Sequence, residues 1–261
     1  MTYNLISVGN NAKTVKGDGR EFLTAITYMK PHKTVYKGNV HNLCPMAGKA
    51  GCAEGCLYTA GRGAMSNVQA GRLRKTELFL ESRTNFMNVL KTDITTFTRR
   101  AIANGIQPCV RLNGTSDIQF EKYDIMEQFP AVQFYDYTKI VKRAYKKLPD
   151  NYHLTLSYSE ANPDYANEVR QAVDDTGVNM AVVFGVKSAD DFPATFRGLP
   201  VINGDKDDLR FLDPTHCVVG LVAKGKAKVR LGKLSEPYDI RNDTSGFVVH
   251  PNEDGTWGRL A

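Results

Sequence analysis

Three cysteines in one short, glycine-rich segment are the residues of this chain best suited to chemistry. The segment spans residues 41–63, HNLCPMAGKAGCAEGCLYTAGRG, and spaces Cys44, Cys52 and Cys56 in a C-x7-C-x3-C arrangement. Small residues let a backbone wrap closely around a bulky group and direct N–H groups toward sulfur. The spacing differs from the paired C-x2-C knuckles of structural zinc sites, and it favours an iron–sulfur cluster held by thiolates.

The segment supplies only three thiols, so a [4Fe-4S] cluster would need a distant fourth ligand or would keep one iron open. Cys109 is the candidate for that ligand, because it begins a predicted strand on the polar face. Cys217 and His41 are weaker candidates, since a buried thiol usually packs as a small hydrophobe and a histidine often caps a turn. A zinc ion, a redox-active thiol pair and cysteines clustered by chance are the other interpretations of the segment.

Short apolar runs that alternate with helical patterns must position the cysteine segment. Strands are predicted at 110–113, 131–136, 152–159, 179–186, 199–203 and 217–223, with an earlier one at 33–36. Apolar residues at helical spacing run from 68 to 97, and shorter helices are predicted at 120–128, 139–147, 163–175 and 189–196. This alternation predicts βαβ units and a mostly parallel sheet.

The predicted strands are apolar on one face only. Cys109, Arg111 and Asn113 share one face of their strand, while Val110 and Leu112 share the other. A doubly wound sheet buries both faces under helices, so this alternation favours an α/β fold of the partial TIM-type (βα) barrel class, with outer helices and a polar lumen. An antiparallel sheet with one solvated face would alternate equally, but the intervening helices argue against it.

Polar residues at the carboxyl ends of these strands predict a small-molecule pocket, because in (βα) barrels those ends build the active site. The guanidinium of Arg111 would need a partner in the lumen, for which Asp117, Asp136 or a bound anion are the candidates. Aromatic packing over the barrel mouth and ordinary loop polarity are the alternative interpretations. The candidate binding residues are Arg111, Asn113, Tyr135, Asp136 and Ser157.

Charge restricts the partners only loosely. With 34 basic and 28 acidic residues the net charge is +6 and the sequence pI is about 9.0, a modest excess that is compatible with nucleic acid. Ordinary solvated surface is the alternative interpretation of the basic residues. They form two groups: Lys142, Arg143, Lys146 and Lys147, and the stretch 224–233 with Lys224, Lys226, Lys228 and Arg230 at period two.

No apolar run approaches the ~18–20 residues of a membrane span, and the N-terminus lacks the apolar region of a signal peptide. We therefore expect a cytoplasmic protein with reduced cysteines and no membrane partner. One domain is predicted over residues 1–223, including the cysteine segment, with residues 224–261 as a basic extension packed on it. The sequence carries no signal for an oligomeric state.

A three-cysteine loop that follows an early strand and precedes a (βα) half-barrel resembles the radical S-adenosylmethionine enzymes. In that superfamily three cysteines bind [4Fe-4S] and the open iron chelates the methionyl amine and carboxylate, so the resemblance implies S-adenosylmethionine as a cofactor. This chain departs from the superfamily in its cysteine spacing, which is typically C-x3-C-x2-C, and it lacks a Gly-Gly-Glu segment near 112–118.

The segments CPMAGKAGCAEGCLYTAGRG, VRLNGTSDI and FPAVQFYDYTK are similar to shared blocks of the bacteriophage gene product 88 family, over roughly residues 35–225. This resemblance implies a viral protein that acts in the host cytoplasm, and it brings no known reaction. We therefore expect a phage-type iron–sulfur protein, either a radical-SAM-like enzyme on a small molecule or a non-enzymatic, cluster-stabilised protein that binds nucleic acid or a host protein.

Overall fold

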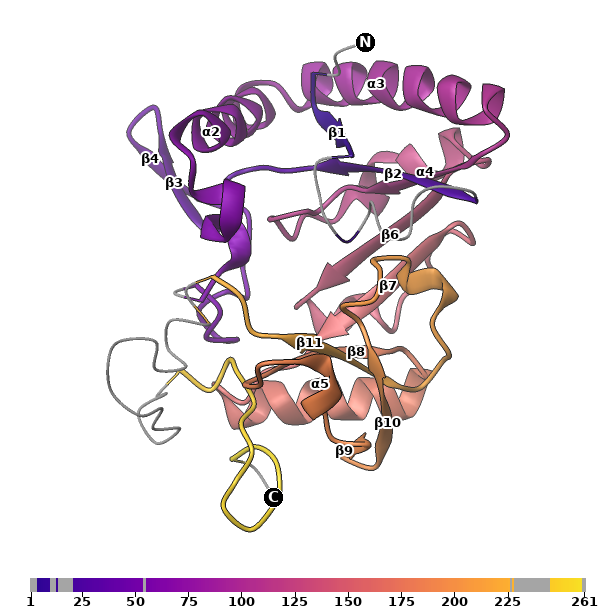
Figure 1. Ribbon diagram of the computed structural model, residues 1–261. Helices are drawn as coiled ribbons and strands as arrows, with labels where there is room; N and C mark the ends of the chain where they lie inside the picture. The colour runs from indigo at the N-terminus through magenta and orange to yellow at the C-terminus, as the bar shows by residue number, and fades with distance from the viewer. Residues whose placement is uncertain are drawn as a thin grey trace.

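A nine-stranded sheet with the order β1-β2-β5-β6-β7-β8-β11-β10-β9 organises the protein (Figure 1). The computed structural model describes residues 4–9, 13, 21–53, 55–225, 227 and 245–259. Every neighbouring pair of strands is parallel except β1–β2 and β9–β10, the pairs at the two ends of the sheet. The predicted α/β class with a mostly parallel sheet is confirmed.

The strands lie close to their predicted positions, with shifted bounds. The first parallel strand, β2, was not predicted from the sequence, because its short run FLTAIT has no helical pattern before it. The bounds are β1 (Ile6–Val8), β2 (Phe22–Thr27), β5 (Gln107–Arg111), β6 (Gln133–Thr138), β7 (Tyr152–Ser157), β8 (Met180–Phe184), β9 (Thr195–Phe196), β10 (Leu199–Asn203) and β11 (Val218–Val222).

Two of the three longer helices of the described residues, α3 and α5, begin at side chains that cap their free N–H groups. Helix α5 (Pro163–Thr176) follows Asn162, whose side chain accepts from the backbone N–H of Tyr165 at 2.9 Å, and it ends at Gly177 with φ +71°. Ser82 caps α3 (Arg83–Ala103) in the same way and separates it from α2 (Ser66–Glu81). The single helical stretch predicted from 68 onward is therefore two helices.

Several predicted helices are only turns. The prediction of a helix at 139–147 is wrong, since this region contains only the 3-10 turn η4 (Val141–Arg143), where the buried Arg143 is held by ion pairs. The segment at 189–196 likewise contains a turn, η5 (Ala189–Asp191). The remaining short elements are η1 (Leu57–Thr59), η2 (Gly61–Ala64), η3 (Phe120–Tyr123), α4 (Ile125–Gln128) and η6 (Arg210–Leu212).

The longer helices cover one face of the sheet. Leu154 and Leu156 project from the same side of β7. Leu154 packs in a cluster with Phe86 of α3, whereas Leu156 packs in a cluster with Val169 of α5. Figure 1 shows α2 and α3 near β1 and β2, and α5 beside β8 and β10 at the other end of the sheet. The apolar face predicted for β7 therefore packs under the helices, whereas β8 has apolar residues on both faces, with Val182 in the helix-side cluster and Val183 in another.

The opposite face is covered in part by the connection between β10 and β11. Asp208 in this connection contacts Arg111 of β5 and Tyr135 of β6. Phe211 of η6 packs edge-on against Phe22 of β2, with ring centres 5.3 Å apart. Because β11 lies between β8 and β10, the last strands do not follow chain order around the sheet. Through these contacts of Asp208 and Phe211, the β10–β11 connection occupies part of the predicted polar lumen.

The cysteine segment is reached through a separate hairpin. The early strand predicted at 33–36 is β3 (Lys33–Tyr36), which pairs with β4 (Asn39–Asn42) outside the main sheet. The hairpin leads directly into the segment, and α2 follows it, so the cysteines lie between the first two parallel strands, β2 and β5.

The predicted basic extension is described only in part. Lys226, Lys228 and Arg230 lie outside the described residues. Farther along, Val249 forms a parallel bridge to Phe184 at the end of β8, and the Trp257 ring lies 5.2 Å from that of Phe184. Across the part of the chain that the structure describes, no helix is both long and apolar enough to cross a membrane.

We expect Phe86→Ala to lower the free energy of unfolding by about 3–5 kcal/mol, because the ring is fully buried and its loss leaves a cavity. Ile102→Ala, in the same helix but with a 56% exposed side chain, should change it by less than about 0.5 kcal/mol. Urea unfolding followed by circular dichroism measures both. Equal midpoints for the two variants would contradict this packing.

Candidate metal centre at the carboxyl ends of the strands

The cysteine segment lies across the carboxyl ends of the central strands. The backbone N–H of Asp117, which follows β5, donates to the carbonyl of Leu43 at 2.8 Å. The hydroxyl of Ser159, which follows β7, donates to the carbonyl of Ala50 at 2.7 Å. Between these anchors the Cys44 thiol lies 3.6 Å from the carbonyl oxygen of Thr115. The segment is therefore fixed at the edge where (βα) folds place their functional residues.

Small residues are needed for this close fit. Gly51 has φ +62°, and a Cβ there would lie 2.5 Å from the Cβ of Ala161 and 2.7 Å from the carbonyl oxygen of Ser245. A Cβ on Gly55 would lie 3.3 Å from the ring of Phe247. The glycines thus let the segment pack against the loop after β7 and against the C-terminal region.

The three cysteine thiols are partly buried, and Cys56 lies within electrostatic range of both Cys44 and Cys52. Burial raises the pKa of Cys44 to about 12, and the charge of Cys56 adds to this effect. Burial also raises the pKa of Cys56, with a further contribution from Cys52. Without a bound cation the thiols of Cys44 and Cys56 stay protonated at neutral pH. No group of three or more His, Cys, Asp or Glu side chains among the described residues is arranged to hold a metal ion.

Two cationic side chains lie beside the thiols. Burial opposes the charge of Lys139, yet its pKa is raised because Cys52, Asp117, Cys44 and Cys56 all favour the ammonium form. Arg72 of α2 is buried, donates to the carbonyl of Tyr58, and lies over the ring of Tyr28 at 5.3 Å. Lys139 directly follows β6, so it is one of the polar residues at the strand ends. It was not among the binding residues predicted from the sequence.

Arg111 and Tyr135, two of the predicted binding residues, meet on the face opposite the helices. Arg111 Nη1 lies 3.0 Å from Asp208 Oδ2, and the Tyr135 hydroxyl donates to the same oxygen at 3.2 Å. The Arg111 guanidinium also lies over the ring of Tyr137, 4.6 Å from its centre. The partner of Arg111 is thus Asp208 rather than the predicted Asp117 or Asp136, and no local pattern marks a residue 97 positions away.

Asn113 and Asp136, two further predicted binding residues, are buried in a second network. Asp136 accepts from the backbone N–H of Asn113 at 2.7 Å, from its side-chain amide at 3.0 Å and from the Tyr152 hydroxyl at 3.0 Å. Burial raises the pKa of Asp136 to about 6, against the opposing effects of Arg111 and of the bonds from Asn113. Asp136 follows Tyr135 in β6, so their side chains point to opposite faces of the sheet. The predicted binding residues are therefore divided between the two faces.

Arg143 links this second network to the cysteine segment. Its guanidinium contacts Asp117 at 3.2 Å and Glu121 at 2.8 Å, and it donates to the Tyr152 hydroxyl at 2.7 Å. Arg143 is fully buried, so it does not contribute to the predicted basic surface. Lys142, Lys146 and Lys147 of that group are exposed.

The other predicted site residues are Cys109, Cys217 and Ser157. Cys109 is buried within β5, and its thiol lies 4.0 Å from the carbonyl oxygen of Gln107, at the amino end of the strand. Cys217 is buried near the carbonyl of Pro214, at 3.2 Å. Ser157 ends β7, and its carbonyl accepts from the Tyr165 hydroxyl at 2.5 Å. Cys109 therefore does not join the three cysteines of the segment.

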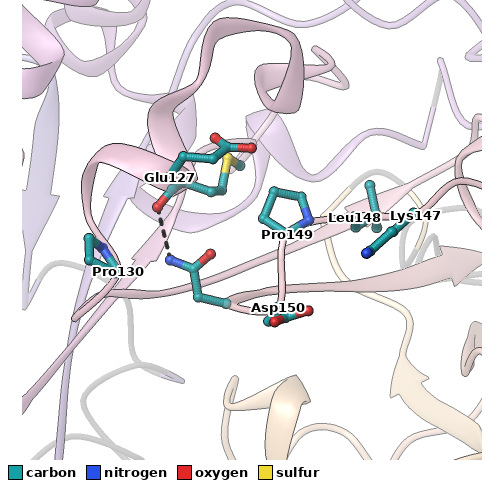
Figure 2. Close-up of a pocket in the computed structure, with 8 residues that line it drawn as sticks. Glu127, Pro130, Lys147, Leu148, Pro149 and Asp150 are labelled. Atoms are coloured by element: carbon teal, nitrogen blue, oxygen red, sulfur yellow. Dashed lines mark hydrogen bonds between the residues drawn. The ribbon is translucent and has the colours of Figure 1, made fainter.

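A shallow pocket of about 510 Å³ lies at the opposite, amino ends of β6 and β7 (Figure 2). Its wall is held by the Asn151 amide, which donates to the carbonyls of Met126 and Phe129 at 3.1 Å. The lining contains no cysteine, so this pocket is separate from the candidate metal centre. The lining residues are Met126, Glu127, Pro130, Lys147, Leu148, Pro149, Asp150 and Asn151.

Removing one member of the buried ion-pair network should be costly. We expect Arg143→Met to lower the free energy of unfolding by about 3–5 kcal/mol, because it leaves the carboxylates of Asp117 and Glu121 without their buried cation. Lys146→Met, on the exposed part of the same connection, is the matched control and should change it by less than about 0.5 kcal/mol. Denaturant unfolding at neutral pH measures both, and equal stability of the two variants would contradict the network.

Comparison with known proteins places this chain in a family. No curated protein and no solved structure matches it. The family model described as gene product 88 matches residues 4–250, which include the whole sheet, the cysteine segment and both buried networks. Since the match covers nearly the entire sequence, the chain belongs to the gene product 88 family.

Proposed function

We propose that this protein binds a [4Fe-4S] cluster through Cys44, Cys52 and Cys56. The observation that carries the proposal is that one glycine-rich segment at the carboxyl ends of the strands holds three partly buried thiols, with Cys56 in electrostatic range of the other two. A zinc ion takes its ligands in one coordination sphere, whereas each thiolate of a cluster binds a different iron.

With three cysteine ligands, one iron of such a cluster is open to a small molecule, and we extend the proposal to a radical-SAM-like enzyme. The order of elements supports this extension, because the cysteine segment lies between the parallel strands β2 and β5. Strands β2, β5, β6, β7 and β8 are neighbours in chain order, as in the wall of a partial TIM-type barrel. S-adenosylmethionine is the small molecule that this proposal assigns to the open iron.

The polar face of the sheet offers groups that could hold part of a small ligand. Three polar atoms there, Arg111 Nε, the Tyr137 hydroxyl and His153 Nε2, have no hydrogen-bond partner among the described residues. Buried polar atoms need a partner, which water or a polar ligand can supply. In the enzyme proposal Arg111 and Tyr137, which lie near the carboxyl ends of β5 and β6, orient the ligand on this face.

A non-enzymatic role is the second candidate, and the connection between β10 and β11 favours it. Arg111 and Tyr135, which would line a substrate pocket, are already bonded to Asp208 of that connection. In this alternative the cluster stabilises a protein that binds nucleic acid or a host protein in the host cytoplasm. The exposed Lys142, Lys146 and Lys147 would contribute to such a basic surface.

Purification without oxygen tests the cluster. We expect broad absorption near ~400 nm and about four irons and four sulfides per chain, as cysteine ligation of such a cluster requires. Changing Cys44, Cys52 or Cys56 to Ser should each abolish most of the bound iron, while Cys217→Ser, at a buried cysteine near Pro214, should retain it. A colourless wild-type protein that retains zinc instead of iron would overturn the proposal.

Adding S-adenosylmethionine to the reduced protein separates the two functional candidates. An open iron should give an altered EPR spectrum on addition, and Cys109→Ser should keep its iron because Cys109 lies at the amino end of β5. An unchanged spectrum together with loss of iron in Cys109→Ser would indicate a closed cluster and favour the non-enzymatic protein.

A further inference from the structure

The C-terminal residues 245–259, here called the strap, are attached to the loop that follows β7. The carbonyl of Gly246 accepts from the backbone N–H of Glu160 at 2.8 Å, and the hydroxyl of Ser159 lies 3.3 Å from the same oxygen. That hydroxyl also donates to the carbonyl of Ala50 in the cysteine segment. One serine side chain therefore joins the strap to the cysteine segment.

The strap also contacts the segment directly, beside its second and third cysteines. Gly51 precedes Cys52 and leaves room for the carbonyl oxygen of Ser245, which a Cβ at that position would approach to 2.7 Å. Gly55, directly before the third cysteine, likewise leaves room for the ring of Phe247, which a Cβ would approach to 3.3 Å. The absence of side chains at these two glycines thus lets the strap lie against the segment.

The middle of the strap is paired with the sheet. The backbone N–H of Val249 donates to the carbonyl of Val183 in β8, and its carbonyl accepts from the N–H of Gly185, both at 2.8 Å. Val249 belongs to the apolar cluster under α5, and Cys52 packs against the same cluster. Backbone pairing therefore holds the strap where it shares a core with the second cysteine.

A buried carboxylate holds the end of the strap. Glu160 Oε2 accepts from the backbone N–H of Arg259 at 2.6 Å. The other oxygen, Oε1, lies 2.8 Å from Arg197 Nη2 and accepts from the Tyr158 hydroxyl at 3.1 Å. A terminal segment attached at separate points opens locally at a lower free energy than the core strands of a sheet. The strap can therefore open while the sheet stays folded.

We propose that the strap is a clamp on the cysteine segment. When closed, it holds the backbone before Cys52 and Cys56 against the sheet, and its opening exposes these two thiols to ligands and oxidants. Cys44 is held from the other side, because the carbonyl of Leu43 accepts from the backbone N–H of Asp117. The clamp goes beyond the proposed function and does not depend on a bound cluster.

Two glycines of the strap provide a matched pair of substitutions in the full chain. Gly246 and Gly255 have φ +64° and +82°, so Gly246→Ala and Gly255→Ala each place a side chain in the left-handed region. A Cβ on Gly246 would lie 2.7 Å from the backbone nitrogen of Ala161, whereas one on Gly255 would meet no atom of the described residues within 4 Å. Only Gly246→Ala therefore pushes the strap away from the loop after β7.

A third variant tests the clamp without a steric change. Glu160→Gln removes the charge of the carboxylate that holds the end of the strap. Each protein is treated with ferricyanide and EDTA and then reduced, so that no bound metal protects the thiols. The rate of alkylation by N-ethylmaleimide is measured for every cysteine by peptide mass spectrometry.

We expect Gly246→Ala to accelerate alkylation of Cys52 and Cys56 at least about tenfold over the wild-type protein, and Glu160→Gln to accelerate it less, because both favour local opening. Gly255→Ala should react like the wild-type protein. Cys44 should change less than its two neighbours, and the buried Cys109 and Cys217 should not change.

Equal rates at Cys52 and Cys56 in Gly246→Ala and Gly255→Ala would overturn the clamp. Equal acceleration of all five cysteines in both Gly246→Ala and Glu160→Gln would also overturn it, because the thiols would then be exposed only when the whole chain unfolds. A wild-type protein whose Cys52 and Cys56 react as fast as in urea would show that the strap does not restrict them.

Discussion

The buried carboxylate of Asp117 connects the cysteine segment to the rest of the protein. Its backbone holds Leu43, and its side chain accepts from Thr138 and Lys139 and pairs with Arg143. One residue therefore joins the segment, the end of β6 and the turn that follows. In surroundings of low dielectric constant each of these bonds depends on the others, since an unpaired member would carry the full desolvation cost. This network thus adds to the apolar packing of Leu43, which is buried in the cluster of α2 and α3.

The two faces of the sheet are stabilised in different ways. The face under the helices is a conventional apolar core, to which the aromatic cluster of α2 and α3 and the small residues of α5 contribute. The opposite face carries charged and phenolic groups, and the β10–β11 connection neutralises part of that charge through Asp208. A polar face can therefore be covered without a helix, provided that the connection supplies a carboxylate at the position of the arginine.

The position of the cysteine segment favours ligand binding, whereas the connection that covers the polar face reduces the room for a ligand. The segment with three thiols lies at the carboxyl ends of the parallel strands, and the polar face of the sheet carries side-chain atoms without a hydrogen-bond partner among the described residues. The same face is partly filled by the chain itself, which reduces the room for a large substrate. A small ligand at the edge, or no substrate at all, agrees better with this arrangement than a deep barrel pocket does.

Local patterns were enough to predict the α/β class and the mostly parallel sheet, because each depends on spacing within a few neighbouring residues. Contacts between distant parts of the chain could not be predicted in this way. Nothing near Arg111 indicates Asp208, and nothing near Arg143 shows that it is buried. Asn113 illustrates the limit: β5 ends at Arg111, so strand alternation no longer governs Asn113, which turns instead to Asp136 on the other face of the sheet.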